Sequence, residues 1–227
     1  MSRRRTRRPA AAPDQPTPMT RPTARDGLFV VVEGPHGVGK TTTTRRLADQ
    51  LRATGARVLV TSEPSGTALG RLVRTGESGL TGRALALAVA ADRCLHIDTE
   101  IAPALKAGLI VISDRYVQSS LVLQRLDGLE IDEVWQYNAH VPVPSLSCYL
   151  RHTAEELGRR LRQRTALSRL EREGSPAREL ALYEEAFDFL AARGWPQVSI
   201  DCRGFDPDQV AAELLRQVQG AYGTHDV

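Results

Sequence analysis

The segment GPHGVGKT at residues 34–41 matches G-x-x-x-x-G-K-[ST], the phosphate-binding P-loop, and its flanks restrict the fold that can contain it. The apolar, β-branched run at residues 28–33 predicts a buried parallel strand. Residues 41–51 predict an amphipathic helix, because Leu47 and Leu51 lie four positions apart. The alternative, a chance glycine turn before a helix, does not explain why strand, loop and helix follow in this order.

The P-loop predicts a set of phosphate contacts. Its glycines let several backbone N–H groups face one point, and the helix N-terminus adds partial positive charge there. We expect Lys40 to reach the β- and γ-phosphates and the Thr41 hydroxyl to ligate Mg²⁺. The expected phosphate-binding residues are Gly34, Pro35, His36, Gly37, Val38, Gly39, Lys40, Thr41 and Thr42.

The rest of the chain alternates between strand and helix patterns. Further short apolar runs predict strands at residues 56–61, 109–113, 146–150 and 197–200. Helical patterns separate or follow them at residues 82–107, 117–125, 131–140, 153–164, 176–193 and 206–220. This alternation predicts an α/β domain over residues 27–227, with a parallel sheet covered by helices on both faces.

Residues 1–26 differ from the rest in composition. They carry seven arginines and two aspartates, a net charge of +5. Because the whole chain has a formal charge of +3, residues 27–227 carry 3 − 5 = −2. The segment lacks apolar periodicity, so we expect a disordered Arg/Pro-rich tail that makes at most weak contacts to nucleic acid.

The sequence gives no signal for export or for a membrane. The tail lacks the apolar stretch of a secretory signal, and no apolar run approaches the roughly 20 residues of a membrane helix. The three cysteines are far apart and lack metal-ligand spacing. We therefore expect a cytoplasmic protein with reduced thiols.

Candidate ligand groups follow two of the predicted strands, at the sheet edge where α/β proteins bind ligands. Glu63 offers a carboxylate in a turn after the second strand, although an ordinary turn would show the same pattern. Asp114 and Arg115 follow the third strand. We expect Asp114 to hold Mg²⁺ together with Thr41, and Arg115 to grip a transferring phosphoryl group. The alternative is a structural Asp–Arg pair.

An arginine-rich segment lies between the fourth and fifth predicted strands. Such a run is usually a solvated helix face, but this one is interrupted by polar residues and Gly174, which suits a mobile lid at about residues 151–176. The P-loop has no arginine, so a lid arginine, assigned to Arg169, would stabilise transition-state charge while closure excludes water. No second acid follows Asp114 to activate water, which favours transfer to a bound acceptor.

Five motifs in this order resemble the thymidylate kinase family of nucleoside monophosphate kinases. They are the P-loop, EPSGT at residues 63–67, AADR at 90–93, DRY at 114–116 with its following serines and Gln124, and SRLE at 168–171. The resemblance implies a P-loop NTPase-type three-layer sandwich with a five-stranded parallel sheet and a mobile lid. It also implies transfer of the ATP γ-phosphate to deoxythymidine monophosphate with Mg²⁺, and a homodimer.

The departures from the family pattern concern the acceptor. The family has an acid that contacts the acceptor sugar where this chain has His36, and a base-stacking aromatic where it has Val89. Stacking of a base on an aromatic ring contributes roughly 1–3 kcal/mol, and valine offers no π-face. The acceptor-binding residues that the resemblance implies are Glu63, Ser65, Val89, Arg93, Arg115, Ser119, Leu123 and Gln124. Arg203, after the last strand, is its candidate adenine contact.

Deoxythymidylate is the first expectation for the acceptor. Two alternatives stay open. One is a kinase for a different or modified nucleotide or nucleoside, with a remodelled base and sugar pocket. The other is a nucleotide-binding regulatory protein without turnover. A nucleic-acid-associated ATPase is disfavoured, because residues 27–227 are slightly acidic and lack a water-activating acid.

Overall fold

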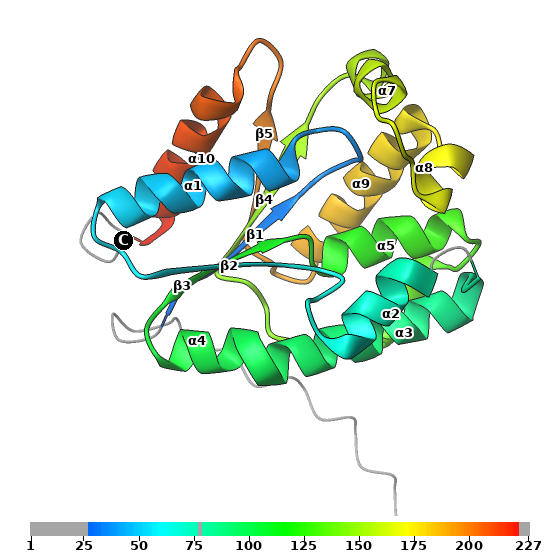
Figure 1. Cartoon of the computed structure of the whole chain (residues 1–227), viewed down its shortest axis with the longest axis horizontal. Coiled ribbons are helices and arrows are strands. Elements are labelled where there is room, and N and C mark those ends of the chain that lie inside the picture. The colour runs from blue at the N-terminus through cyan, green and yellow to red at the C-terminus, as the bar shows by residue number, and fades with distance from the viewer. Residues whose placement is uncertain (1–26, 77–78, 223–227) are drawn as a thin grey trace, which may run out of the picture.

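The computed structural model describes residues 27–76 and 79–222, and within them the chain forms one parallel sheet. Its strands are β1 (Phe29–Glu33), β2 (Val58–Ser62), β3 (Ile110–Asp114), β4 (Leu146–Arg151) and β5 (Gln197–Asp201). The spatial order is β2-β3-β1-β4-β5, with β1 in the centre (Figure 1). Val30 of β1 pairs with Ile112 of β3 and Leu146 of β4. The predicted five-stranded parallel sheet is thereby confirmed.

Helices connect and follow the strands. They are α1 (Lys40–Ala53), α2 (Ala68–Gly76), α3 (Gly82–His96), a π-helical turn (Ile97–Ile101), α4 (Ala102–Lys106), α5 (Val117–Leu126), α6 (Ile131–Gln136), α7 (Ala154–Arg162), α8 (Arg169–Glu173), α9 (Pro176–Ala191) and α10 (Pro207–Tyr222). The helix predicted at residues 82–107 is thus continuous but carries a π turn. Helices α2 and α8 were not predicted, and the one predicted at residues 131–140 ends at Gln136.

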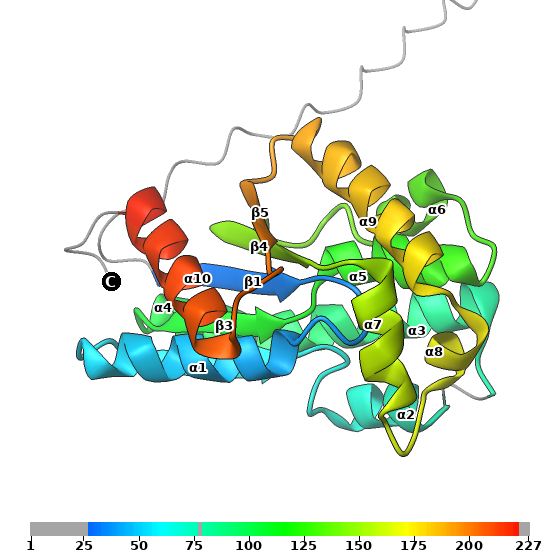
Figure 2. The same ribbon diagram turned by 90° about the horizontal axis from the view of Figure 1, so that it is seen from above.

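Side-chain alternation along the strands builds a separate core on each face of the sheet. Val30 and Val32 of β1 pack toward α1 and α10, where Leu47 and Leu214 are fully buried. Figure 1 and Figure 2 show α1 and α10 together on that side of the sheet. The expected three-layer arrangement follows from this division.

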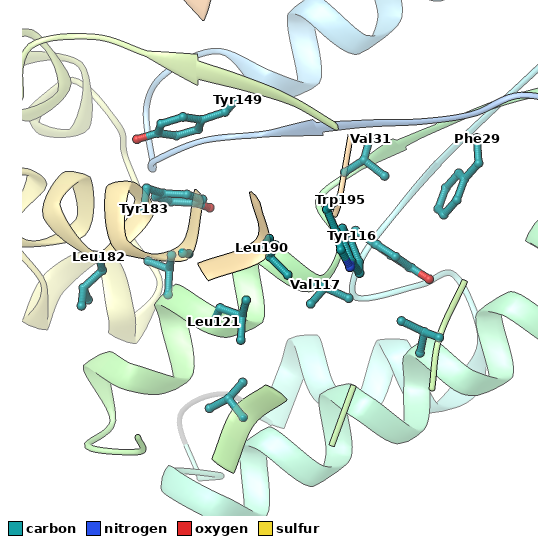
Figure 3. Packing of buried hydrophobic residues seen from close by; sticks show 14 of the residues in the cluster. Phe29, Val31, Tyr116, Val117, Leu121, Tyr149, Leu182, Tyr183, Leu190 and Trp195 are labelled. Atoms are coloured by element: carbon teal, nitrogen blue, oxygen red, sulfur yellow. The ribbon is translucent and has the colours of Figure 1, made fainter. Parts of the chain in front are cut away.

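The second core contains most of the aromatic residues. Phe29 and Val31 of β1 point to this face and meet side chains of α3, α5 and α9 (Figure 3). The Phe29 and Tyr116 rings meet edge to face at 5.0 Å, and Trp195 lies 6.3 Å from Tyr116. Each fully buried apolar side chain contributes roughly 1.5–3 kcal/mol to folding. This core therefore anchors α5, whose first turn lies at the carboxyl end of the sheet.

Neither the tail nor the domain limits are tested by the fold. The expected disorder of residues 1–26 lies outside the described residues, and the limits of the domain and of the lid stay predictions. Among residues 27–76 and 79–222, no helix has both the length and the apolar character needed to cross a membrane.

Candidate active site

The P-loop joins the end of β1 to the start of α1, and its backbone requires glycine. Gly34, Gly37 and Gly39 all have positive φ, at 141°, 83° and 108°. A Cβ atom on Gly34 would also lie 2.5 Å from the Leu150 carbonyl oxygen. Any side chain at position 34 would therefore clash with the backbone of β4.

Lys40 begins α1 and folds back over the P-loop. Its Nζ donates to the carbonyl oxygens of Gly34 at 2.7 Å and Pro35 at 2.9 Å. Burial, reinforced by the nearby Arg115 guanidinium, lowers the pKa of Lys40 to about 7. A bound polyphosphate would supply the negative charge that restores the ammonium form. The position fits the phosphate contact predicted for Lys40.

Thr41 and Asp114 meet next to Lys40. The Thr41 hydroxyl donates to Asp114 Oδ2 at 2.5 Å, and Asp114 Oδ1 is buried without a hydrogen-bond partner among the described residues. Mg²⁺ prefers oxygen ligands, and here a buried carboxylate oxygen without a partner lies beside a hydroxyl group. These two residues therefore fit the predicted metal site.

A cavity of about 240 Å³ opens over the P-loop, and we call it the donor cavity. Its lining residues are His36, Gly37, Gly39, Lys40, Thr41, Thr42, Asp114, Arg115, Arg164 and Glu171. Most of these were predicted from the motif. Arg164 and Glu171 belong to the lid segment, so the lid contributes one wall of the cavity.

Arg115 has an unusual backbone conformation. It is the one described residue other than glycine with positive φ, at 78°. Its N–H donates to Val32 at 3.0 Å, its carbonyl accepts from the Ser113 hydroxyl at 2.7 Å, and its guanidinium donates to Ser119 Oγ at 3.0 Å. Backbone strain of this kind persists where the surroundings enforce it, commonly at functional sites.

Glu33, the last residue of β1, fixes α5 against the P-loop. Its buried carboxylate accepts hydrogen bonds from the backbone N–H groups of Tyr116 at 2.7 Å and Ser119 at 3.1 Å. It also accepts from the Ser119 hydroxyl at 2.7 Å. A carboxylate at a helix N-terminus satisfies unpaired N–H groups and complements the helix dipole. From the sequence, Glu33 was predicted only as the last residue of the strand at residues 28–33.

A second cavity, of about 270 Å³, lies among α2, α3, α5 and α8, and we call it the acceptor cavity. Figure 2 shows these helices together beyond the carboxyl ends of β1 and β3. Of the predicted acceptor-binding residues, the lining contains Glu63, Val89, Arg93, Arg115, Ser119, Leu123 and Gln124. Gln124 Oε1 is buried and has no partner in the described part of the chain. It is therefore open to a ligand.

Ser65, the remaining predicted acceptor residue, does not line this cavity. It is fully buried, and its N–H and hydroxyl donate to the two Asp92 oxygens at 2.7 Å and 2.6 Å. The structure thus shows Ser65 holding the turn after β2, and its acceptor contact stays a prediction. Gly70 packs so closely on this turn that a Cβ atom there would lie 2.3 Å from the Ser65 carbonyl oxygen.

Arg93 is buried and its guanidinium is extensively paired. Nε donates to Glu63 at 2.7 Å, and a terminal nitrogen donates to the Tyr116 carbonyl at 3.0 Å and the Ser120 hydroxyl at 2.9 Å. The other terminal nitrogen donates to Asn138. This network fixes one wall of the acceptor cavity. Asn138 was not predicted, because nothing near it in the sequence marks it as a partner of Arg93.

The lid arginines divide into two groups. Arg169 makes two hydrogen bonds of 2.7 Å to the Asp127 carboxylate and one of 2.9 Å to Glu173, and it does not line the donor cavity. Arg160 instead donates to the Val38 carbonyl in the P-loop at 3.2 Å, and Arg164 lines the donor cavity. The catalytic role of Arg169 stays a prediction. The geometry instead places Arg160 against the P-loop and Arg164 at the donor cavity.

Arg203 lies at a separate small cavity at the ends of β4 and β5. It pairs with Asp201 at 2.8 Å, and Arg151, His152 and Thr153 complete the lining. Its contact with adenine stays a prediction.

His36 is held by Glu179, a residue of α9 that the sequence did not single out. Glu179 Oε1 lies 2.9 Å from both the His36 backbone nitrogen and His36 Nδ1. Burial lowers the pKa of His36, although the hydrogen bond to Glu179 opposes that effect. Burial raises the pKa of Glu179, but the His36 bond and the charges of Lys40 and Arg115 lower it overall. A neutral imidazole beside a carboxylate is the resulting state near pH 7.

Comparison with known families identifies this arrangement. The family model described as thymidylate kinase matches residues 32–193, which is more than half of the chain. The chain belongs to the thymidylate kinase family. The matched region contains the P-loop, both cavities and the lid segment. Membership confirms the resemblance drawn from the motifs and makes the protein a phosphotransferase.

Several relatives in this family are moderately similar to the chain. A protein of Caldivirga maquilingensis named "Probable thymidylate kinase" is 40% identical over 149 residues, covering 64% of this chain and 73% of the relative. One of the same name from Pyrococcus abyssi is 39% identical over 154 residues, with 64% and 75% coverage. A "Thymidylate kinase" of Xanthomonas euvesicatoria pv. vesicatoria is 45% identical over 124 residues, with 53% and 54% coverage.

Proposed function

We propose that the protein transfers the γ-phosphoryl group of Mg²⁺-bound ATP to deoxythymidine monophosphate. The observation that carries this proposal is that His36, Arg115 and Glu171 line both the donor and the acceptor cavity. Two cavities that share a wall can hold two nucleotides with their phosphates adjacent. Family membership and the names of the relatives support the same reaction.

The residues of the donor cavity would bind ATP and balance the negative charge of its phosphates. The P-loop amides and Lys40 would cradle the β- and γ-phosphates, and Thr41 and Asp114 would hold the metal. Bound Mg²⁺ would neutralise charge that develops on the phosphate oxygens. Arg115, at the shared wall, would pair with the transferring group or the acceptor phosphate through its planar fork. Arg164 would add a second positive charge from the lid.

The acceptor cavity suits a pyrimidine. The unpartnered Oε1 and the amide N–H of Gln124 can pair with the N3–H donor and a carbonyl acceptor on the edge of thymine. The aliphatic part of the cavity's lining comprises Val73, Leu85, Val89, Leu123 and Leu170. The base is then held by packing and by the edge contact. No observation favours a regulatory protein without turnover or a kinase for another acceptor.

An acceptor panel tests the proposed reaction. Coupled measurement of kcat/KM with Mg·ATP should give the highest value for deoxythymidylate among common nucleoside monophosphates. Lys40→Ala should lower kcat at least about 10²-fold, because it removes the charge nearest the transferring group. Lys106→Ala is the matched control, since Lys106 is the chain's other lysine and is exposed at the end of α4. A preference for another monophosphate, or full activity of Lys40→Ala, would reject the proposal.

We also propose that the protein works as a homodimer in the cytoplasm. Leu72 of α2 and Leu87 and Leu95 of α3 are 59%, 48% and 39% exposed, and because α2 and α3 pack against each other these leucines offer apolar surface to a second copy. Light scattering should give twice the chain mass, and Leu87→Glu should give monomers. A monomeric wild-type protein would contradict the dimer.

The cysteines support the proposed cytoplasmic location. All three are free, as expected in a reducing compartment.

A further inference from the structure

Replacement of the family's acid by His36 first suggests that the pocket has lost its hydrogen-bond acceptor for the sugar. The structure indicates otherwise. His36 lies on the wall shared by the two cavities, and Glu179 reaches it from α9. Glu179 is 5% exposed, so its carboxylate is nearly removed from water. A carboxylate in that position needs strong donors, and His36 provides them.

The bonds to Glu179 determine which ring nitrogen carries hydrogen. An ionised carboxylate only accepts hydrogen bonds, so the Nδ1 atom that lies 2.9 Å from Glu179 Oε1 must be the protonated one. The His36 backbone N–H donates to the same oxygen at 2.9 Å, which fixes the ring relative to the loop. In the neutral imidazole, Nε2 then carries a lone pair. Nε2 has no hydrogen-bond partner among the described residues.

The surroundings keep the ring neutral. The His36 side chain is 11% exposed, and the positive groups that oppose a second proton are Lys40 and Arg115. Glu179 acts in the opposite direction but is outweighed by burial, so the pKa of His36 stays below its ordinary value. Near pH 7 the group therefore offers the cavity a hydrogen-bond acceptor.

We propose that Glu179 is a positioning residue that holds His36 in the Nδ1–H form, so that Nε2 accepts a hydrogen bond from the sugar hydroxyl of the acceptor nucleotide. The ligand group that meets Nε2 must be a hydrogen-bond donor. A phosphate oxygen carries only lone pairs, which would repel the lone pair of Nε2. His36 lines both the donor cavity, with its phosphate-binding groups, and the acceptor cavity, with its apolar wall at Val89, and this position suits the sugar that joins the acceptor's phosphate to its base. This inference rests on the proposed function.

A substrate series tests the sugar contact. Deoxythymidylate has one free sugar hydroxyl, at the 3′ position, and 3′-deoxythymidine monophosphate lacks it. We expect the wild-type kcat/KM to fall about 10-fold or more between these acceptors, because the loss leaves Nε2 without a partner. His36→Ala should bring the ratio close to one. An unchanged ratio in His36→Ala overturns the sugar contact, even where transfer itself is normal.

Variants of Glu179 test its positioning role. Glu179→Leu should reduce the 3′-hydroxyl preference at least about threefold and raise the acceptor KM, while the KM for ATP changes less than about twofold. Glu179→Gln keeps the shape and one acceptor oxygen, so it should restore part of the preference. Glu185→Gln, on the exposed side of the same helix, is the matched control. Full preference in Glu179→Leu would overturn the positioning role.

Nitrogen NMR of the histidine rings gives a readout that does not depend on activity. At pH 7.5 the His36 ring, assigned by its absence in His36→Asn, should show Nδ1 protonated and Nε2 bare, and this form should be lost in Glu179→Leu. An Nε2–H form or an imidazolium in the wild type would overturn the inference. If the wild type transferred phosphate to no monophosphate, the proposed function would fail while this spectrum still tested Glu179.

Discussion

At the scale of single residues, Arg115 combines a strained backbone with a central position. Its φ of 78° turns the side chain toward the wall that the two cavities share. Ser113 and Ser119 hold it there through hydrogen bonds at its carbonyl and its guanidinium. The strain is thus compensated by local contacts, and the guanidinium is placed before any ligand arrives.

We predict that Arg115→Lys lowers kcat/KM about 10²- to 10³-fold. Lysine keeps the charge but cannot make the paired hydrogen bonds of the planar fork. Steady-state kinetics with thermal unfolding as a check would measure the effect. Ser119→Ala, which removes one partner of the guanidinium, should cost much less activity. Near wild-type activity of Arg115→Lys would show that charge alone is sufficient at this position.

At the scale of elements, the lid is attached to the body of the domain at an ion pair. Arg169 of α8 binds both oxygens of Asp127, just after α5, and both side chains are nearly buried. The short helix α8 begins with Ser168 and Glu171 in a complete capping box, which satisfies its first N–H groups. These contacts fix the lid where Arg164 and Glu171 line the donor cavity.

We predict that Asp127→Ala and Arg169→Ala each lower the free energy of unfolding by about 1–3 kcal/mol, because each removes both hydrogen bonds of a nearly buried ion pair. Arg164→Ala should instead lower kcat at least about 10²-fold with little loss of stability. Urea unfolding and steady-state kinetics on the three variants separate the roles. If Arg169→Ala lost activity without loss of stability, the catalytic role expected from the sequence would be supported.

The elements also show what the sequence could predict. The five strands were found because each is a short run with β-branched or apolar residues followed by turn residues. The nine-residue helix α2 was missed because it contains Gly70 and Gly76, which lower helix propensity. The five-residue helix α8 is too short for a periodic pattern, although its capping box is visible in the sequence.

The residues of the candidate site also divide into those with a local sequence signal and those without one. The P-loop, Asp114 and Arg115 were predicted because their chemistry is encoded in consecutive residues. Glu179 was not, since a glutamate in a helical pattern is normally exposed, and only the packing of α9 brings it to His36. Ser65 does not line the acceptor cavity because Asp92 binds its hydroxyl, a contact that no local pattern reveals.

At the scale of the whole molecule, one of the two cores beside the sheet protects two of the three thiols. Cys148 and Cys202 lie in the core beneath α1 and α10 and are nearly inaccessible. Burial raises the pKa of Cys148 to about 12 and that of Cys202 to about 11. Cys94 is only half-buried, and its sulfur lies 3.2 Å from His140 Nε2.

We predict that alkylation of the native protein at pH 8 modifies Cys94 alone. The thiolate is the reactive form, and at that pH the two core thiols remain protonated as well as covered. Cys148 and Cys202 should stay unmodified even at pH 9 until urea unfolds the domain. Peptide mass spectrometry would measure the sites. Early labelling of Cys148 would contradict the described core.

The aromatic cluster of the second core has one more consequence. Tyr116 lines the acceptor cavity and lies 6.3 Å from Trp195, which is 6.1 Å from Trp135, the chain's other tryptophan. The Trp195 indole is therefore one side chain away from the acceptor cavity, and the Trp135 indole is two side chains away. Emission from the unlabelled protein should report when that cavity fills, so that affinities can be titrated by fluorescence without a dye.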